Sequence, residues 1–372
     1  MSEVHVSRRA RLRESCAAEG GRNPADAVLV SLPSNIRYLT GQAAPGAALL
    51  LGADGEDTLI TARTEDSEPG RPPVDGLRTA VLAASEGDPV LVAAQFAVES
   101  GAGSLAVEEH HLTVARHRSL GRTAPGVRLA DLGCAVEQQR VVKDDEEISA
   151  LRVAAEITDQ ALGELLESIL VGRTERHLAL ELERRLIDHG AEGPAFPTSV
   201  ATGANAGLAT HRPTDRRVEE GDFLSVRLGA NYHGYRCQVG RTFVIGTAPD
   251  DWQIELYDLV FAAQRAAREA LLPGASCREV DGAARRVLGD AGHSAALGPS
   301  TGHGVGLEIG EDPRLTPEAM SRLDACVPVT VEPGVHLPGR GGVRIDDTLV
   351  VRPQADGGPE LLTITTKELL AL

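Results

Sequence analysis

The chain has 372 residues, which is long for one ordinary domain and sufficient for two. Its net charge of −17 argues against nucleic acid or an anionic membrane as a partner, because both require clustered Lys and Arg. Five scattered cysteines contain no CxxC pair, so they support neither a disulfide framework nor a zinc knuckle. No signal peptide and no apolar run of about 20 residues is found, so the sequence predicts a cytoplasmic protein without a membrane segment.

The first part of the chain alternates short apolar stretches with turn signals, which is typical of an α/β domain. Ala27–Leu32 and Ala47–Leu51 are predicted to be buried strands. Asp57–Ala62 and Leu91–Ala94 are weaker strand candidates. This part of the sequence contains no catalytic cluster.

Charge density rises sharply at Val141–Glu147, and a helical pattern of apolar residues follows from Ile148 to Leu165. We therefore predict a boundary here. An N-terminal domain covers residues 1–140 and a second domain covers residues 141–372.

The second domain contains an internal repeat. Ser168–Gly190 can be aligned with Ala270–Gly292 at a single offset. Three residues that begin or end helices then coincide: Gly172 with Gly274, Thr174 with Ser276, and Gly190 with Gly292. Each copy predicts a Gly turn, a helix that begins at a hydroxyl cap and a second Gly that ends the helix. Such a duplication would bury a sheet between two helical layers, with a site at the seam.

Four stretches of the second domain carry a family resemblance, and a fifth lies in the first domain. They are HRPTDRRVEEGDFLSVRLGANYHGYRCQVGRTF from His211, TGHGVGLEIGEDP from Thr301, TVEPGVHLPG from Thr330, GGVRIDDTLVV from Gly341, and SNIRYLTG from Ser34. In order and spacing they resemble the M24 family of methionine aminopeptidase, prolidase, aminopeptidase P and creatinase. The resemblance implies an α+β protein: an N-terminal α/β creatinase-type domain followed by a pita-bread domain with an internal pseudo-twofold repeat.

The resemblance also implies a pair of divalent metals on five side chains, and here that set is incomplete. His303, Glu332 and Asp346 match three of the ligands, whereas Arg227 and Gln238 replace two aspartates. A guanidinium is always protonated and has no lone pair for a metal. We therefore expect no metal cofactor, with Arg227 forming a salt bridge to Glu332 or Asp346. The alternative is one Mn, Co, Zn or Fe ion on His303, Glu332 and Asp346.

The sequence also has fewer of the histidines that the resemblance implies for proton transfer. His211 matches one of them, and His336 replaces a tyrosine that commonly follows the EPG motif. Histidine is the side chain suited to proton transfer near neutral pH, so His211 is the preferred proton carrier. His336 is either a substitute proton carrier or a hydrogen-bonded replacement for the ring.

Three functions remain open. The first is a metal-independent, creatinase-like C–N hydrolase or lyase acting on a small polar substrate. The second is a mononuclear-metal hydrolase of the Xaa-Pro aminopeptidase or dipeptidase type, and the third is a non-catalytic member of the family. The resemblance further implies a homodimer that binds a small molecule or short peptide. The candidate catalytic residues are His211, Glu332 and His303, and the candidate substrate-binding residues are Arg227, Gln238, Asp346, His336 and Arg344.

Overall fold

The computed structural model describes residues 2–17, 24–42, 45–62, 76–83, 87–168 and 170–372. The chain divides into two compact units, Met1–Arg140 and Val141–Leu372, each with a hydrophobic core. None of the helices in these ranges is long and apolar enough to cross a membrane.

The first unit is built on a six-stranded sheet in the order β4-β3-β2-β1-β5-β6. Its strands are β1 (Ala27–Val30), β2 (Ala48–Leu51), β3 (Asp57–Ala62), β4 (Arg78–Leu82), β5 (Ser104–Val107) and β6 (Arg128–Asp131). Its helices are α1 (Ser2–Ala17), α2 (Pro33–Thr40), α3 (Pro89–Glu99), α4 (Val114–Thr123) and α5 (Ala135–Arg140). The central strand β1 runs parallel to β5 and antiparallel to β2, so the sheet is mixed.

Three of the four strands predicted in this unit are confirmed, and the fourth prediction was wrong. Leu91–Ala94 lies inside α3. Asp88 accepts a hydrogen bond from the Val90 N–H, and Pro89 occupies the first turn. An N-cap carboxylate followed by proline favours the start of a helix, and this signal outweighs the apolar run behind it.

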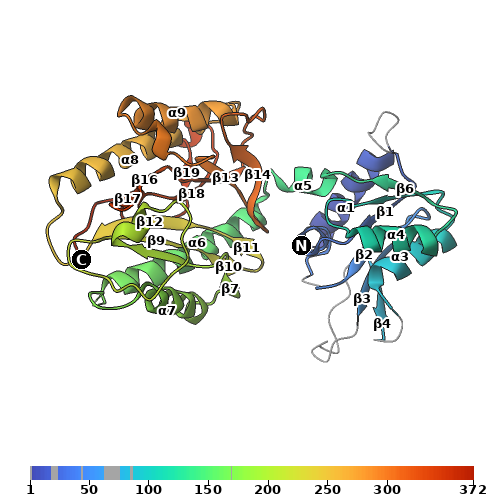
Figure 1. Ribbon diagram of the computed structural model, residues 1–372. Coiled ribbons are helices and arrows are strands. Elements are labelled where there is room, and N and C mark those ends of the chain that lie inside the picture. The colour runs from blue at the N-terminus through green and yellow to red at the C-terminus, as the bar shows by residue number, and fades with distance from the viewer. Residues whose placement is uncertain (1, 18–23, 43–44, 63–75, 84–86, 169) are drawn as a thin grey trace. The chain divides into compact units, whose positions relative to one another are not determined.

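The second unit consists of two halves, each with two long helices followed by strands. The first half contains α6 (Asp145–Leu166), α7 (Glu175–Asp188), β7 (Gly193–Pro194), β8 (Ser199–Thr202), η1 (Gly203–Gly207), β9 (Phe223–Leu228), β10 (Ala230–Tyr232), β11 (Tyr235–Arg236) and β12 (Val239–Val244). The second contains α8 (Asp251–Ala270), α9 (Cys277–Asp290), η2 (Ser294–Ala296), β13 (Gly302–Val305), β14 (Ile309–Leu315), β15 (Pro328–Val331), β16 (Gly334–Leu337), β17 (Gly341–Arg344), β18 (Asp347–Val350), η3 (Gln354–Asp356) and β19 (Glu360–Leu361). In Figure 1, α6 and α7 cover one side of the strands and α8 and α9 cover the other.

The predicted internal repeat is visible in the geometry of the two helix pairs. Thr174 and Ser276 are the N-caps of α7 and α9, and each of these helices has 14 residues. Gly172 and Gly274 precede the caps with φ angles of 81° and 87°, a left-handed conformation that suits glycine. The same turn glycine and cap residue at the same spacing thus produce the same local structure in both halves.

The two halves are joined where two sheets meet. The sheet β12-β9-β8 belongs to the first half and the sheet β14-β13-β15-β18-β19 to the second. Gly240 and Asp346 exchange two backbone hydrogen bonds, of 3.1 and 2.9 Å, across this seam. A Cβ atom at position 240 would lie 2.5 Å from Cγ of Asp346, so glycine is needed for this close approach.

A buried ion pair fixes the C-terminal segment beside the seam. Arg241 Nη2 and Asp347 Oδ1 are 2.7 Å apart, and both side chains are inaccessible to solvent. Gln264 Nε2 and Thr363 Oγ1 also donate to the Asp347 carboxylate, and Lys367 Nζ lies 3.1 Å from it. Removing one partner of such a network leaves uncompensated charge in the interior.

We therefore expect Asp347→Ala to lower the free energy of unfolding of the second unit by about 3–5 kcal/mol. Trp252, the only tryptophan in the chain, lies in this unit, so its fluorescence during urea unfolding reports the change. The control is Arg265→Ala, which removes an exposed pair with Glu269 and should cost less than about 1 kcal/mol. Equal losses in both variants would contradict this role for Asp347.

Candidate active site

Four of the predicted site residues lie together at the seam between the two halves: Glu332, Asp346, Arg227 and Gln238. Glu332 directly follows β15, and Asp346 lies between β17 and β18. Both carboxylates are buried, with exposed fractions of 8% and 0%. Arg227 projects from β9, and Gln238 precedes β12. The structure therefore brings residues from both halves of the repeat into one polar cluster.

Arg344 bridges the two buried carboxylates. Its Nη2 donates to Glu332 Oε2 at 2.5 Å, and its Nε donates to Asp346 Oδ1 and Oδ2 at 2.7 and 2.9 Å. The Gln238 amide also connects them, because its Nε2 donates to Glu332 Oε2 at 2.6 Å and to Asp346 Oδ2 at 2.8 Å. Two donors thus hold the carboxylates close together and offset their mutual repulsion.

Arg227 makes longer contacts with the same carboxylates. Its Nη2 lies 3.4 Å from Glu332 Oε2, and its Nε lies 3.3 Å from Asp346 Oδ2. Its shortest hydrogen bond runs from Nη2 to Gln238 Oε1, at 3.0 Å. The principal salt bridges of the cluster are therefore formed by Arg344, and Arg227 contributes a second, more distant positive charge.

His303 faces the remaining free oxygen of Glu332. Its Nδ1 lies 3.1 Å from the Gly304 carbonyl oxygen, an acceptor, so Nδ1 carries a proton and donates. The other ring nitrogen, Nε2, lies 3.6 Å from Glu332 Oε1. A histidine oriented in this way by a backbone carbonyl resembles the usual arrangement of a metal-binding imidazole.

The charges around Glu332 keep it ionised. Burial raises its pKa, but the positive charge of Arg344, with contributions from His303, Arg227 and the Gln238 hydrogen bond, lowers the pKa to about 2. The same carboxylates hold the pKa of Arg344 well above its ordinary value despite the opposing effect of burial. Burial and the nearby Arg344 charge lower the pKa of Arg227. At neutral pH Glu332 therefore acts as an anion that binds or orients and is a poor carrier of protons.

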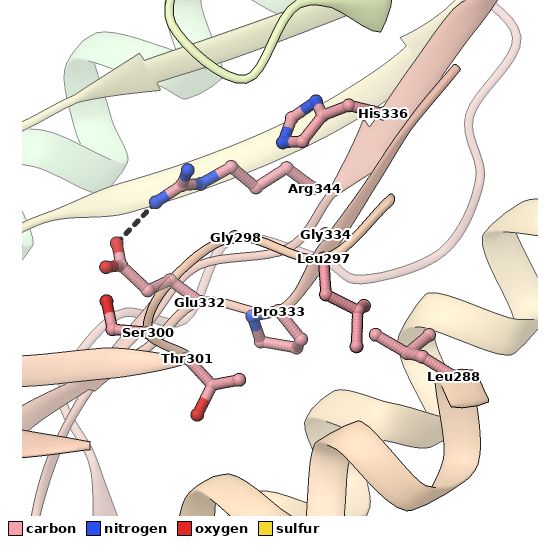
Figure 2. Close-up of a pocket in the computed structure, with 10 residues that line it drawn as sticks. All are labelled: Leu288, Leu297, Gly298, Ser300, Thr301, Glu332, Pro333, Gly334, His336 and Arg344. Atoms are coloured by element: carbon pink, nitrogen blue, oxygen red, sulfur yellow. Dashed lines mark hydrogen bonds and ion pairs between the residues drawn. The ribbon is translucent and has the colours of Figure 1, made fainter. Parts of the chain in front are cut away.

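A small cavity opens beside this cluster. It is lined by Leu288, Leu297, Gly298, Ser300, Thr301, Glu332, Pro333, Gly334, His336 and Arg344, and its free volume is about 30 Å³. Figure 2 shows Arg344 extended toward Glu332, with His336 on the other side of Arg344.

His336 lines this cavity and has one unsatisfied ring nitrogen. Its Nδ1 is buried and has no hydrogen-bond partner among the described residues. Burial and the charge of Arg344 lower the pKa of His336, so the ring is neutral at physiological pH. A neutral imidazole with an unpartnered nitrogen can accept or donate a proton to a bound group.

His211 is placed differently from the other candidates. Its Nε2 lies 2.8 Å from Glu175 Oε2, and its side chain is nearly buried. The His211 carbonyl accepts a hydrogen bond from Ser199 Oγ, and Ser199 is the register partner of Arg227. In the part of the chain that the structure describes, no hydrogen bond or ion pair joins His211 to the buried carboxylates.

Glu175 organises the loop that carries His211. Besides His211, its carboxylate accepts hydrogen bonds from the Thr202 N–H, from Asn205 Nδ2, and from both the N–H and the hydroxyl of Thr214. Burial raises its pKa, but these hydrogen bonds, led by that from the Thr214 hydroxyl, lower it overall. The sequence showed Glu175 only as the residue after a helix cap, with no signal for its link to His211.

Two further features of the site were not expected from the sequence. One is the bridging role of Arg344, although its position two residues before Asp346 would place both side chains on one face of an extended chain. The other is Phe196, whose ring centroid lies 5.0 Å from the guanidinium carbon of Arg227. The sequence around a single aromatic residue in a loop does not predict such a contact.

The donor set as arranged does not fit a pair of divalent ions, and it offers only two donors to a single ion. His303 Nε2 and Glu332 Oε1 face each other, but Asp346 is held by Arg344, and Arg227 blocks the remaining side of the cluster. Among the described residues, no three His, Cys, Asp or Glu side chains are arranged to hold a metal ion. A third protein donor therefore becomes available only if Arg344 releases Asp346.

The site is thus formed by buried acidic residues and a histidine at the seam of a duplicated α+β unit. Residues 149–353 match the metallopeptidase family M24, and residues 8–142 match the creatinase/prolidase N-terminal domain. The chain belongs to metallopeptidase family M24.

Several relatives are similar over most of their length. The Xaa-Pro dipeptidase of Pyrococcus horikoshii is 31% identical over 94% of this chain and 95% of its own. That of Pyrococcus furiosus is 38% identical over 63% of this chain and 66% of its own. The solved structure of Xaa-Pro dipeptidase from Bacillus anthracis has a TM-score of 0.91 and 29% identity, covering 99% of this chain and 100% of that one.

These comparisons confirm the predicted family and fold class and identify an enzyme that hydrolyses C–N bonds. They also correct two predictions. The metal-independent, creatinase-like hydrolase or lyase was wrong, because the relatives that span nearly the whole chain are Xaa-Pro dipeptidases. The expected absence of a metal cofactor was wrong as well, because the matching family is one of metallopeptidases. The prediction gave more weight to Arg227 and Gln238, which replace two ligands, than to His303, Glu332 and Asp346, which remain.

The Glu175 network predicts a specific acid sensitivity. The pKa of Glu175 in the folded protein is below its ordinary value of 4.5. Its contribution to stability is therefore complete above pH 4.5 and is lost as the pH falls through the folded-state pKa. We expect Glu175→Gln to lower the free energy of unfolding at pH 7 by about 1–3 kcal/mol and to reduce its loss in acid.

The measurement is urea unfolding followed by Trp252 fluorescence between pH 3 and pH 7. The matched control is Glu269→Gln, which alters a carboxylate whose side chain is 72% exposed and should leave the pH dependence unchanged. An acid sensitivity of Glu175→Gln as large as that of the wild type would show that Glu175 does not contribute to it.

Proposed function

We propose that this protein hydrolyses short peptides of the Xaa-Pro type, cleaving the C–N bond before proline as a mononuclear-metal dipeptidase. The observation that carries the proposal is the pair formed by His303 Nε2 and Glu332 Oε1, which face each other in a buried site at the seam. The proposal is supported by full-length similarity to a relative named Xaa-Pro dipeptidase.

A single divalent ion held by His303, Glu332 and, after release from Arg344, Asp346 would polarise the peptide carbonyl and lower the pKa of water. This chain's own residues bind the substrate and move the proton. Glu332 remains ionised and accepts hydrogen bonds from groups that enter the cavity. We assign His336, which lines the same cavity and has a neutral ring, the role of receiving the water proton and returning it to the leaving nitrogen. His211, bound to Glu175, positions the neighbouring loop.

The reaction consumes one water molecule. The water oxygen forms a bond to the carbonyl carbon, the bond from that carbon to the proline nitrogen breaks, and the nitrogen takes up the proton. The products are a free amino acid and free proline. General acid–base catalysis of this kind typically supplies roughly 10²–10⁴-fold in rate.

We expect purified protein supplied with Mn²⁺, Co²⁺ or Zn²⁺ to release proline from Xaa-Pro dipeptides and to act poorly on Xaa-Ala dipeptides. Glu332→Gln and His336→Ala should each lower kcat by about 10²-fold or more. Arg265→Ala, on the exposed face of α8, should leave kcat unchanged. The proposal fails if folded wild-type protein releases no amino acid from any dipeptide with any of these metals.

We also propose that the protein is a homodimer in the cytoplasm. The family resemblance supports the dimer, and five free cysteines are consistent with a reducing compartment. We expect light scattering at micromolar concentration to give twice the chain mass of 39.1 kDa. A monomer at all concentrations tested would contradict this expectation.

A further inference from the structure

A carboxylate on α9 holds the loop that leads into β13. Thr301, the last residue of this loop, donates a hydrogen bond from its hydroxyl to Asp281 Oδ1 at 2.9 Å. Both residues are buried, with exposed fractions of 1% for Asp281 and 5% for Thr301. Figure 2 shows the Thr301 hydroxyl directed away from the Glu332 carboxylate. The hydroxyl is therefore engaged by the helix and is not directed at the hydrolytic groups.

Asp281 is itself fixed by an arginine one helical turn away. Arg285 Nε donates to Asp281 Oδ2 at 2.6 Å, and Arg285 Nη2 donates to the Gly298 carbonyl oxygen at 2.9 Å. Residues four apart on a helix lie on the same face, so this pair presents one polar surface to the loop. The loop 297–301 is thus held at two points, at Gly298 by Arg285 and at Thr301 by Asp281.

Thr301 connects Asp281 to the two residues that face each other in the site, His303 and Glu332. The Thr301 carbonyl oxygen accepts a hydrogen bond from the Glu332 N–H at 2.7 Å. His303 follows Thr301 by two residues and lies on β13. The position of Thr301 therefore affects Glu332 through a direct hydrogen bond and affects His303 through the backbone.

The packing around this segment leaves little room for adjustment. A Cβ atom at position 302 would lie 2.0 Å from the Thr330 carbonyl oxygen, so Gly302 lies against the neighbouring strand β15. The His303 N–H donates to Thr330 Oγ1 at 3.2 Å, and Thr330 precedes Glu332 by two residues. Closely packed interiors transmit a displacement because they contain few voids. A shift of Thr301 would therefore move the groups on both strands.

We propose that Asp281 is a positioning residue, which holds Thr301 so that His303 Nε2 and Glu332 Oε1 face each other at 3.6 Å. Among the described residues, no hydrogen bond or ion pair joins Asp281 to His303 or Glu332, so its effect acts through Thr301. The inference rests on the proposed function for the hydrolytic step. A misplacement of about 1 Å can lower a rate by about 10²-fold.

The first experiment removes the Thr301 hydroxyl and then restores it. Thr301→Val keeps the shape of the side chain, so we expect kcat for Ala-Pro to fall by about 10- to 100-fold and KM to change by less than about 3-fold. Thr301→Ser restores the donor to Asp281 and should recover most of that loss. A purely structural role predicts the opposite order, because only Thr301→Ser removes a buried methyl group. Equal kcat values, or a lower value for Thr301→Ser, would overturn the inference.

The second experiment changes Asp281. Asp281→Asn keeps the size of the side chain but presents an amide N–H to Arg285 or to Thr301, so at least one of the two hydrogen bonds is lost. We expect kcat to fall by about 10-fold or more, with a smaller change in KM. The matched control is Asp188→Asn on α7, which removes a carboxylate that is 63% exposed and paired with Arg184 at the same helical spacing. It should keep the wild-type kcat, and an equal kcat in folded Asp281→Asn would contradict the role.

Crystal structures of the wild type and the Thr301 variants test the geometry without peptide hydrolysis. In Thr301→Val we expect the distance from His303 Nε2 to Glu332 Oε1 to grow by about 1 Å, a shift sufficient for the expected loss of rate. Thr301→Ser should keep the wild-type distance. If the wild-type enzyme hydrolyses no dipeptide, the proposed function fails, and these distances still decide whether Asp281 positions the pair. An unchanged distance in Thr301→Val would overturn the positioning role.

Discussion

The salt bridges from Arg344 to Glu332 and Asp346 are the interaction on which the rest of the site depends. Two carboxylates buried this close would repel each other, and an isolated buried charge is costly. Arg344, assisted by the Gln238 amide, offsets that cost with hydrogen bonds of 2.5–2.9 Å. The arrangement also requires Gly240, because any side chain there would collide with Asp346. The packing of the seam and the ionisation of the two carboxylates therefore depend on the same contacts.

This constraint explains how a member of a metallopeptidase family can differ from the family pattern and still retain an active-site geometry. On one side of the cluster, Arg344 and Arg227 supply positive charge beside Asp346. On the other side, Glu332 Oε1 and His303 Nε2 are free of such pairs and face each other. The chemistry we propose is therefore concentrated on the His303 side.

Much of the fold was predictable because its signals are local. Thr174 and Ser276 begin helices in both halves, and Gly172 and Gly274 adopt the left-handed turns that precede them. The grouping of the site residues followed from the family resemblance. The partners were not predictable, because Glu175 with His211, and Phe196 with Arg227, are joined only by tertiary packing. The metal and function predictions were wrong because the two replaced ligands were given more weight than the three that remain, and the similarity to metallopeptidases corrected them.

The number of metal ions bound per chain tests the account most directly. Crystals soaked in saturating Mn²⁺ and measured by anomalous diffraction would locate each ion relative to His303, Glu332 and Arg227. The account predicts one ion per chain, between His303 and Glu332, with Arg227 retained in the position described here. Two ions per chain, or an ion bound on the Arg227 side of the cluster, would contradict it.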